Sequence, residues 1–338
     1  MKATTIPALF VLLTLPASAA VNIDWVTVGN AGNAAQNPDN RTHSSSGGDG
    51  YGAVADTFRI SRNETTISQY AAFLNAVAAT TDPYNLYHSS MASNGNVAGI
   101  SRSGSSGSYS YTVIGSGDRP ITYVSWFDAA RFANWMHNGQ PNGSHTVGIT
   151  EDGAYNLNGA TSGIFTKNPG ATVWIPTEDE WYKAAYYDPT KNAGAGGYWW
   201  QANQSDTMTS NDPLDAGAAN YKQGDYATTP GIGSYSSSQN YLTEVGIYGA
   251  DSQSYYATND QAGNVMEWVD SVNGTGHFWR GGAWIFDYPT DVASTFTVGG
   301  TSTDEYSYGG FRLASVPEPT TGLLAVLGLF PLLSRRRK

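Results

Sequence analysis

Three capping-box sequences constrain the fold of this 338-residue chain more than any other feature. In such a box a Ser or Thr is followed three residues later by an acidic residue or Gln, and the two side chains satisfy free N–H groups at a helix start. The boxes occupy residues 66–69, 125–128 and 177–180 and predict three short helices. Long polar stretches separate them, so the helices do not alternate with strands as in a parallel α/β protein. We therefore expect an α+β fold, with short helices, short strands and long loops in one compact domain.

Apolar residues after each box recur at helical intervals and predict the faces that the helices bury. These residues are Tyr70, Leu74 and Val77; Trp126, Ala129, Ala130, Ala133 and Met136; and Trp181, Ala184 and Ala185. We also expect Trp268 and Trp284 to be buried, because Trp side chains contribute much of the apolar area of a core.

Short strands are predicted where β-branched or aromatic residues interrupt the polar stretches. The expected strands are residues 21–28 (at a sheet edge), 58–60, 119–124, 265–269 and 309–313. The stretches 30–52, 82–117, 143–170 and 191–259 are rich in Gly, Ser, Asn and Tyr, and we expect mainly loops there.

The stretch from Asp260 to Trp268 predicts a tight turn that leads into a strand. Gly263 and Asn264 tolerate positive φ angles. Asp260 and Glu267 bracket the turn, whose carbonyl groups could point inward beside the two carboxylates. Such oxygen ligands suit a hard cation. The alternative is a hairpin turn whose carboxylates are solvated or hydrogen-bonded, since no EF-hand spacing is present.

In the strand that follows, side chains alternate between two faces. Val265, Glu267 and Val269 share one face, and Met266 and Trp268 share the other.

The two ends of the chain predict export. Residues 1–20 combine a basic start, an apolar run and a small-residue cleavage site, which is typical of a secretory signal peptide. Residues 316–338 contain Pro-Glu-Pro, a short apolar run and a terminal Arg cluster, and they resemble a PEP-CTERM sorting signal. The resemblance implies transient membrane insertion, processing by an exosortase-type enzyme, and delivery to the cell surface or extracellular matrix. A retained membrane anchor is the alternative.

Charge and cysteine content exclude several functions. Residues 1–20 and 316–338 hold five of the 17 Lys and Arg and one of the 28 Asp and Glu, so the remaining domain has a net charge near −15. This acidity argues against nucleic-acid binding. The chain has no Cys, which rules out disulfides, thiol chemistry and thiolate metal ligands.

Six ordered elements lie between about residues 55 and 315. They are Arg62-Asn63-Glu64-Thr65-Thr66 with Gln69-Tyr70 and Phe73; Arg119-Pro120-Ile121 with Val124-Ser125-Trp126-Phe127-Asp128-Ala129; Ile175-Pro176-Thr177-Glu178-Asp179-Glu180-Trp181; Gly263-Asn264-Val265-Met266-Glu267-Trp268; Arg280-Gly281-Gly282-Ala283-Trp284; and Gly310-Phe311-Arg312. Together they resemble one family, the formylglycine-generating enzymes, also called the sulfatase-modifying-factor domain. The resemblance implies a single C-type-lectin-like domain over residues 21–315, stabilised by calcium.

The resemblance also implies calcium ligands. One site would use the side chains of Asp260 and Glu267 with the carbonyl groups of Gly263 and Val265. A second family site maps less well, onto Asn220, Tyr221 and Asp225, because the spacing from these residues to Thr228-Thr229-Pro230 departs from the family pattern.

The chain departs from the family at its catalytic thiols. The family's enzymes oxidise a substrate cysteine with two active-site cysteines that bind copper, and these positions fall on Phe286 and Asp291. Neither residue supplies a soft ligand for copper. We therefore expect no copper and no conversion of a sulfatase.

Two functions follow from this departure. The first is a non-catalytic binding module for a glycan or a surface protein, since Tyr, Ser, Asn and Gly suit adaptable recognition. The second is a metal-dependent oxidoreductase on the same scaffold, which would need paired histidines. His137 and His145 are the nearest pair, whereas His43, His88 and His277 are isolated in the sequence.

Overall fold

The computed structural model describes residues 20–36, 50–207 and 210–317. The predicted signal peptide up to residue 19 and the predicted sorting signal from residue 318 onward lie outside these residues. Within the described part, no helix is long and apolar enough to span a bilayer.

All three predicted capping boxes are formed. Helices α1 (Ile67–Val77), α3 (Trp126–His137) and α4 (Glu178–Tyr186) begin after Thr66, Ser125 and Thr177, respectively. In each box the hydroxyl group accepts from the backbone N–H three residues on, and the third residue's side chain accepts from the capping N–H. Local hydrogen bonding therefore determines where each helix begins.

The strands form two four-stranded sheets and two hairpins. The first sheet has the order β1 (Trp25–Val28), β2 (Phe58–Ser61), β12 (Ala314–Ser315), β5 (Val173–Trp174), and all its pairs are antiparallel. The second has the order β10 (Val298–Gly300), β9 (Gly276–Arg280), β8 (Met266–Asn273), β11 (Gly309–Phe311), with β8 and β11 parallel. The hairpins are β3 (Ile100–Ser103) with β4 (Ser110–Val113), and β6 (Tyr187–Asp188) with β7 (Gly197–Tyr198). The other short elements are α2 (Ser90–Ser93) and the 3₁₀ helices η1 (Ala250–Ser252) and η2 (Pro289–Val292).

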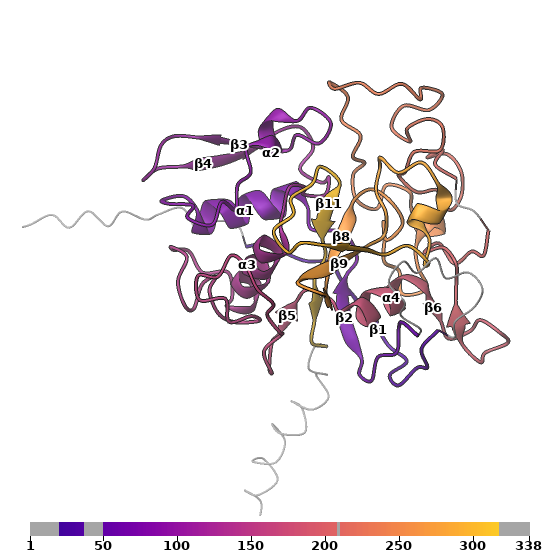
Figure 1. Cartoon of the computed structure of the whole chain (residues 1–338). Helices are drawn as coiled ribbons and strands as arrows, with labels where there is room; N and C mark the ends of the chain where they lie inside the picture. Colours follow the sequence, from indigo (N-terminus) through magenta and orange to yellow (C-terminus); the bar gives the residue numbers. More distant parts are fainter. Residues whose placement is uncertain (1–19, 37–49, 208–209, 318–338) are drawn as a thin grey trace, which may run out of the picture.

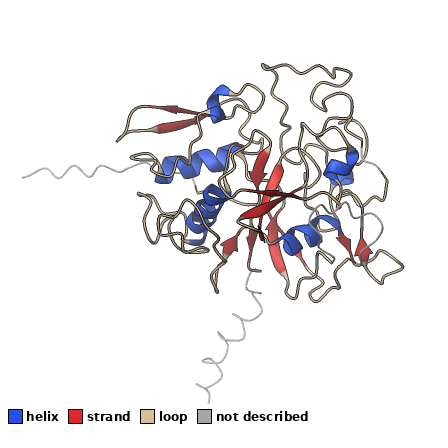
Figure 2. Ribbon diagram, in the orientation of Figure 1, coloured by secondary structure: helices blue, strands red, loops and turns tan. Residues whose placement is uncertain are grey.

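The helices flank the central strands. Figure 1 shows α1 and α3 on one side of the strands and α4 on the other, with long loops covering the side of α4. Figure 2 shows how much of the chain is loop. Strand β12, near the end of the described chain, lies between β2 and β5, so the first and last parts of the domain meet in one sheet. This arrangement confirms the predicted α+β class.

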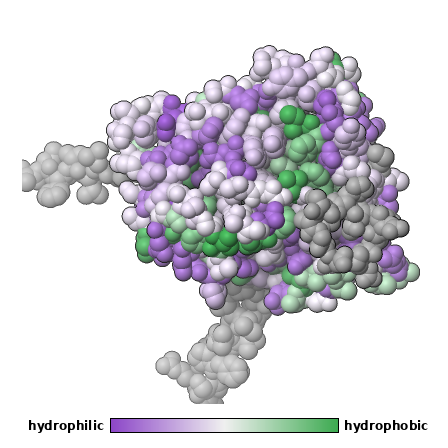
Figure 3. All heavy atoms as spheres, viewed as in Figure 1, coloured by the Kyte–Doolittle hydropathy of each residue, from purple (hydrophilic) through white to green (hydrophobic). Residues whose placement is uncertain are grey.

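The core is rich in aromatic side chains. Trp126, Trp181, Trp268 and Trp284 are all buried, as predicted. The rings of Trp268 and Trp279 stack with their centroids 3.5 Å apart. The predicted inward faces of the three helices are buried too, apart from the half-buried Met136. The surface seen in Figure 3 is mostly polar, with small separate apolar patches.

One predicted strand does not form, and one expected loop contains unpredicted elements. Residues 119–124 form only an isolated bridge between Pro120 and Thr66, because Pro120 lacks an N–H group and Tyr123 has a φ of 58°. Residues 82–117 are mostly loop, as expected, but they also contain α2 and the β3–β4 hairpin, which were not predicted. The side chain of Asn75 bonds the backbone N–H and C=O groups of Tyr111 and so ties this hairpin to α1.

Candidate functional site

The turn at residues 260–264 brings two distant parts of the chain together. Asp260, Gly263 and Asn264 have φ angles of 57°, 85° and 58°, which confirms the positive φ predicted at the last two. A Cβ atom at Gly263 would lie 2.2 Å from the carbonyl oxygen of Asn220, so this close approach requires glycine. The turn therefore lies directly against Asn220, the first residue of the second predicted site.

Glu267 is buried beside Arg312 at the start of β8. Its carboxylate accepts two hydrogen bonds from the guanidinium group of Arg312, at 2.5 and 2.7 Å, and a third from Nε1 of Trp181 at 2.7 Å. Neither Glu267 nor Arg312 is exposed to solvent. Since both oxygens already accept hydrogen bonds, Glu267 could offer a cation only its remaining lone pairs.

Glu64 is a site residue whose role the sequence analysis missed. Its carboxylate accepts from Nδ2 of Asn264 at 3.0 Å and from the backbone N–H of Val265 at 3.2 Å. Glu64 therefore holds the turn that carries the predicted carbonyl ligands. Its place in the first family element, residues 62–66, was the only signal in the sequence.

The turn gathers more negative than positive charge. Burial, and then the charges of Asp260 and Glu267, raise the pKa of Glu64 well above its ordinary value. Burial raises the pKa of Asp260 to about 6, although its carboxylate accepts the N–H of Gly246 at 2.6 Å. Three buried carboxyl groups thus surround one guanidinium group, that of Arg312, and despite its burial their charges raise its pKa. A bound cation or a retained proton would offset this surplus.

The turn offers oxygen atoms, the type of ligand that hard cations bind. Asp260 lines a cavity of about 10 Å³ together with Ser252 and Ala262, which is about the room that one water-sized sphere needs. Among the described residues, no group of three or more His, Asp and Glu side chains is placed to hold a metal ion. The carbonyl groups of Gly263 and Val265 would therefore have to complete any ligand set.

The second predicted site is only partly brought together. The Asn220 amide donates to the carbonyl oxygen of Tyr241 and to Oδ1 of Asn264, both at 2.9 Å, so it is tied to the turn. Asp225 instead accepts from Asn211 and from the backbone N–H of Gly231. Tyr221 is buried between these two positions in the chain.

Comparison with known proteins decides the family. The model of the sulfatase-modifying factor enzyme 1-like domain, FGE-sulfatase, matches residues 25–316. The chain belongs to this family.

Three solved structures match most of this sulfatase-modifying-factor domain at low sequence identity, and the first of them indicates a shared fold. Treponema denticola variable protein 1 is 17% identical, with a TM-score of 0.52 over 89% of this chain and 97% of that one. CarF is 18% identical, with a TM-score of 0.47 over 88% of this chain and 100% of its own. PvdO from Pseudomonas aeruginosa is 16% identical, with a TM-score of 0.47 over 87% of this chain and 94% of its own. No curated protein matches the sequence.

The positions that resemble the catalytic cysteines of the sulfatase-modifying-factor family lie after β9. Phe286 is half-buried, and its ring contacts Phe296 and Tyr308 with centroids 5.5 and 5.8 Å apart. Asp291 lies in η2, where its carboxylate accepts the backbone N–H of Tyr288 at 3.3 Å. Aromatic packing and a local turn are therefore found at the two positions predicted for the thiols.

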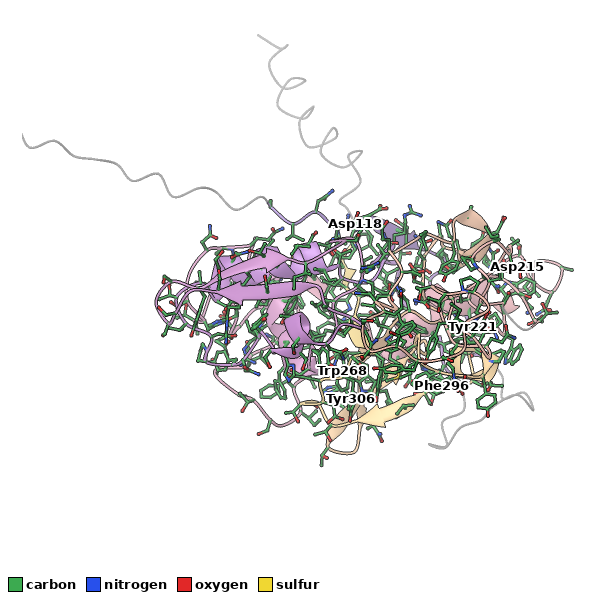
Figure 4. All side chains as sticks on the ribbon, turned by 90° about the horizontal axis from the view of Figure 1, so that it is seen from above. Asp118, Asp215, Tyr221, Trp268, Phe296 and Tyr306 are labelled. Atoms are coloured by element: carbon green, nitrogen blue, oxygen red, sulfur yellow. The ribbon has the colours of Figure 1, made fainter. Side chains whose placement is uncertain are left out.

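Phe286, Phe296, Tyr306 and Tyr308 form a connected group that we call the aromatic face. Tyr306 and Tyr308 stack at 5.0 Å with an interplanar angle of 9°. Tyr306 is 38% exposed, and the other three members are half-buried. Figure 4 labels Tyr306 and Phe296 on the same side of the molecule as Trp268. Flat aromatic groups that are partly exposed can contact a ligand at low entropic cost.

The predicted histidine pair takes part in other contacts. Nδ1 of His137 lies 2.8 Å from the hydroxyl group of Thr172, whereas His145 packs edge-on against Tyr84. In the part of the chain that the structure describes, neither residue belongs to a group that could hold a metal ion.

Proposed function

We propose that this sulfatase-modifying-factor-like protein is a non-catalytic, calcium-stabilised binding module that contacts a glycan or a surface protein through its aromatic face. One observation carries the proposal: the chain has no thiol, and Phe286 at the predicted thiol position packs into a partly exposed aromatic group. Copper-dependent oxidation of a cysteine needs thiolate ligands that this chain does not have.

Calcium is proposed as a structural ion at the turn of residues 260–267. The buried excess of carboxyl groups and the small cavity beside Asp260 support this assignment. Asp260 and carbonyl groups of the turn would hold the ion, and its charge would offset that of the buried carboxyl groups.

Export to the cell surface or matrix is proposed from the two ends of the sequence. An exosortase-type enzyme would process the tail, and the alternative is a membrane anchor kept at residues 316–338. Intact-mass measurement of the protein from cell and medium fractions tests this: loss of the tail supports processing, and an intact tail in membranes supports an anchor.

A glycan array and a surface-protein pull-down test the binding function. Tyr306→Ala and Tyr308→Ala should each lower the affinity for a captured ligand at least about tenfold, because losing an aromatic anchor at an interface costs on the order of 2 kcal/mol of binding free energy. Tyr255→Ala is a matched control, since Tyr255 is a similarly exposed tyrosine outside the aromatic face.

Three outcomes would contradict parts of the proposal. Ligand binding that is equally strong in all the variants would place the contact elsewhere. Absence of any ligand in both screens would remove support for a binding module. Copper-dependent turnover of a peptide thiol by the purified protein would overturn the non-catalytic assignment.

A further inference from the structure

A pair of carboxyl groups lies between α3 and the loop of residues 301–308, which joins β10 to β11. Asp128, in the first turn of α3, is 2% exposed, and its carboxylate accepts from the N–H and hydroxyl groups of Ser125 at 2.8 and 2.7 Å. The carboxyl group of Glu305, from the loop, lies within hydrogen-bonding reach of Asp128. Two carboxyl groups can hydrogen-bond to each other only when one of them keeps its proton.

Acidic and neutral groups surround this pair. Asp82, whose side chain is 3% exposed, faces both carboxyl groups from the connection between α1 and α2. Nε2 of His88 lies 3.7 Å from Glu305. Nδ1 of His88 accepts the N–H of Ser90 at 3.1 Å, so in the neutral ring Nε2 carries the proton.

The nearby basic side chains are already paired with other acids. Arg131 also lies on α3, but it makes two hydrogen bonds to Glu151, at 2.9 and 3.1 Å. Arg102 lies 3.9 Å from Asp82. Among the described residues, His88 is the one ion-pair partner of Glu305. No guanidinium or ammonium group among them therefore neutralises Glu305 directly.

The electrostatic surroundings keep a proton on the pair. Burial, followed by the charge of Asp128, raises the pKa of Glu305 to about 8. Burial also raises the pKa of Asp128 to about 6, although hydrogen bonds from Ser125 act in the opposite direction. Since the two groups titrate together, the pair holds one proton into the neutral range.

The loop is also held by His277 at Ser302, by Trp284 at Ser307 and by Met266 at Tyr308. Two backbone hydrogen bonds join it to the start of α3. The backbone N–H of Trp126 donates to the carbonyl oxygen of Ser302, and the N–H of Tyr123 donates to that of Tyr306, both at 3.0 Å. Tyr123 has a left-handed backbone, and His88 stacks on its ring at 4.9 Å. The carboxyl pair therefore adds a third attachment between the loop and the turn that precedes α3.

We propose that Asp128 and Glu305 form a proton-dependent latch that holds the loop of residues 301–308 against α3. With one shared proton the two groups hydrogen-bond; when the proton passes to solvent, two like charges face each other and the loop loosens. The loop carries Tyr306 and Tyr308, so the latch would also control the aromatic face. That last consequence rests on the proposed function.

Hydrogen exchange of the full chain at pH 6 and pH 9, corrected for intrinsic rates, tests the latch. In the wild-type protein, the protection of the amides of Tyr123 and Trp126, which donate to carbonyl groups of the loop, should fall about tenfold, which corresponds to a change of one pKa unit in the pair. In Glu305→Gln the amide group donates to Asp128 at either pH, so protection should change less than about twofold. A role in packing alone would shift protection equally at both pH values.

Two further variants keep the test decisive. Asp128→Asn should also remove the pH dependence and replaces Glu305→Gln if that variant fails to fold. Asp118→Asn should behave like wild type, since Asp118 is exposed and Figure 4 shows it on the opposite side of the molecule from Tyr306. Wild-type protection of these two amides that is independent of pH, or equal pH dependence in all variants, overturns the latch. These measurements use no ligand, so a failed binding screen bears on the proposed function alone.

Discussion

Glu267 and Arg312 form a fully buried, two-pronged ion pair at the centre of the molecule, with N–O distances of 2.5 and 2.7 Å. Arg312 also donates to the backbone carbonyl groups of Ser61, Arg62 and Asn259. One guanidinium group therefore joins the start of β8, the end of β2 and the loop before the turn.

We expect Arg312→Met to lower the free energy of unfolding by about 3–5 kcal/mol, because it leaves a buried carboxylate without its partner. Urea denaturation measures this. Lys222→Met removes a partly exposed pair with Asp287 and should cost no more than about 1 kcal/mol. Equal losses in the two variants would contradict a central role for the buried pair.

Calcium should stabilise the folded protein. At a free concentration of one hundred times its Kd, an ion that binds only the folded state adds about 2.7 kcal/mol, which raises Tm. Asp260→Asn should remove most of this increase. It is a cleaner variant than Glu267→Ala, which would also leave Arg312 without its partner.

Differential scanning calorimetry with calcium and with chelator measures the effect of calcium. Glu244→Gln, at an exposed acidic residue, should keep the full increase in Tm. If calcium and chelator leave Tm unchanged in the wild-type protein, the predicted site is wrong.

Truncation of the stacked tryptophan pair should be costly. Trp268→Ala removes a fully buried ring that packs on Trp279, and we expect a loss of about 3–5 kcal/mol in unfolding free energy. Tyr288→Ala, at a side chain that is 68% exposed, should stay within about 0.5 kcal/mol of wild type. A small effect of Trp268→Ala in denaturation curves would show that the core repacks around the gap.

His277 should make the protein less stable in acid. Burial lowers the pKa of His277 to about 4, below its ordinary value of 6.5. As the pH falls, His277 is therefore protonated in the unfolded chain before it is protonated in the folded protein. The stability that the neutral ring contributes is fully present above pH 6.5 and is lost as the pH falls toward 4. Between pH 7 and pH 4.5 this effect should lower the free energy of unfolding by roughly 2–3 kcal/mol.

His277→Phe isolates this contribution, since a Phe ring can keep the stacking on Trp126, 4.0 Å away, without titrating. Asp260 has a raised pKa, so its protonation stabilises the fold as the pH falls, opposite to the effect of His277. The quantity to compare is therefore the difference in free energy of unfolding between wild type and variant at each pH. A difference that does not change with pH would show that His277 is not the group that titrates.

Local sequence determined the helices and the central turn. Each capping box acts within four residues, and Gly263 and Asn264 are residue types that tolerate the positive φ angles found in the turn. Where structure depends on distant residues, local patterns failed. The β3–β4 hairpin is tied to α1 by Asn75, 36 residues before Tyr111, and residues 119–124 are held by a bridge to Thr66 in place of a sheet.

The same division applies to the candidate site. The sequence by itself determined that thiol chemistry is absent and that Asp260 and Glu267 flank a turn. Only the tertiary structure brought Arg312 and Glu64 to that turn, since Arg312 is 45 residues from Glu267 and Glu64 is 200 residues from Asn264. The balance of charge in a buried site depends on which side chains folding brings within a few ångströms, and sequence spacing does not encode that distance.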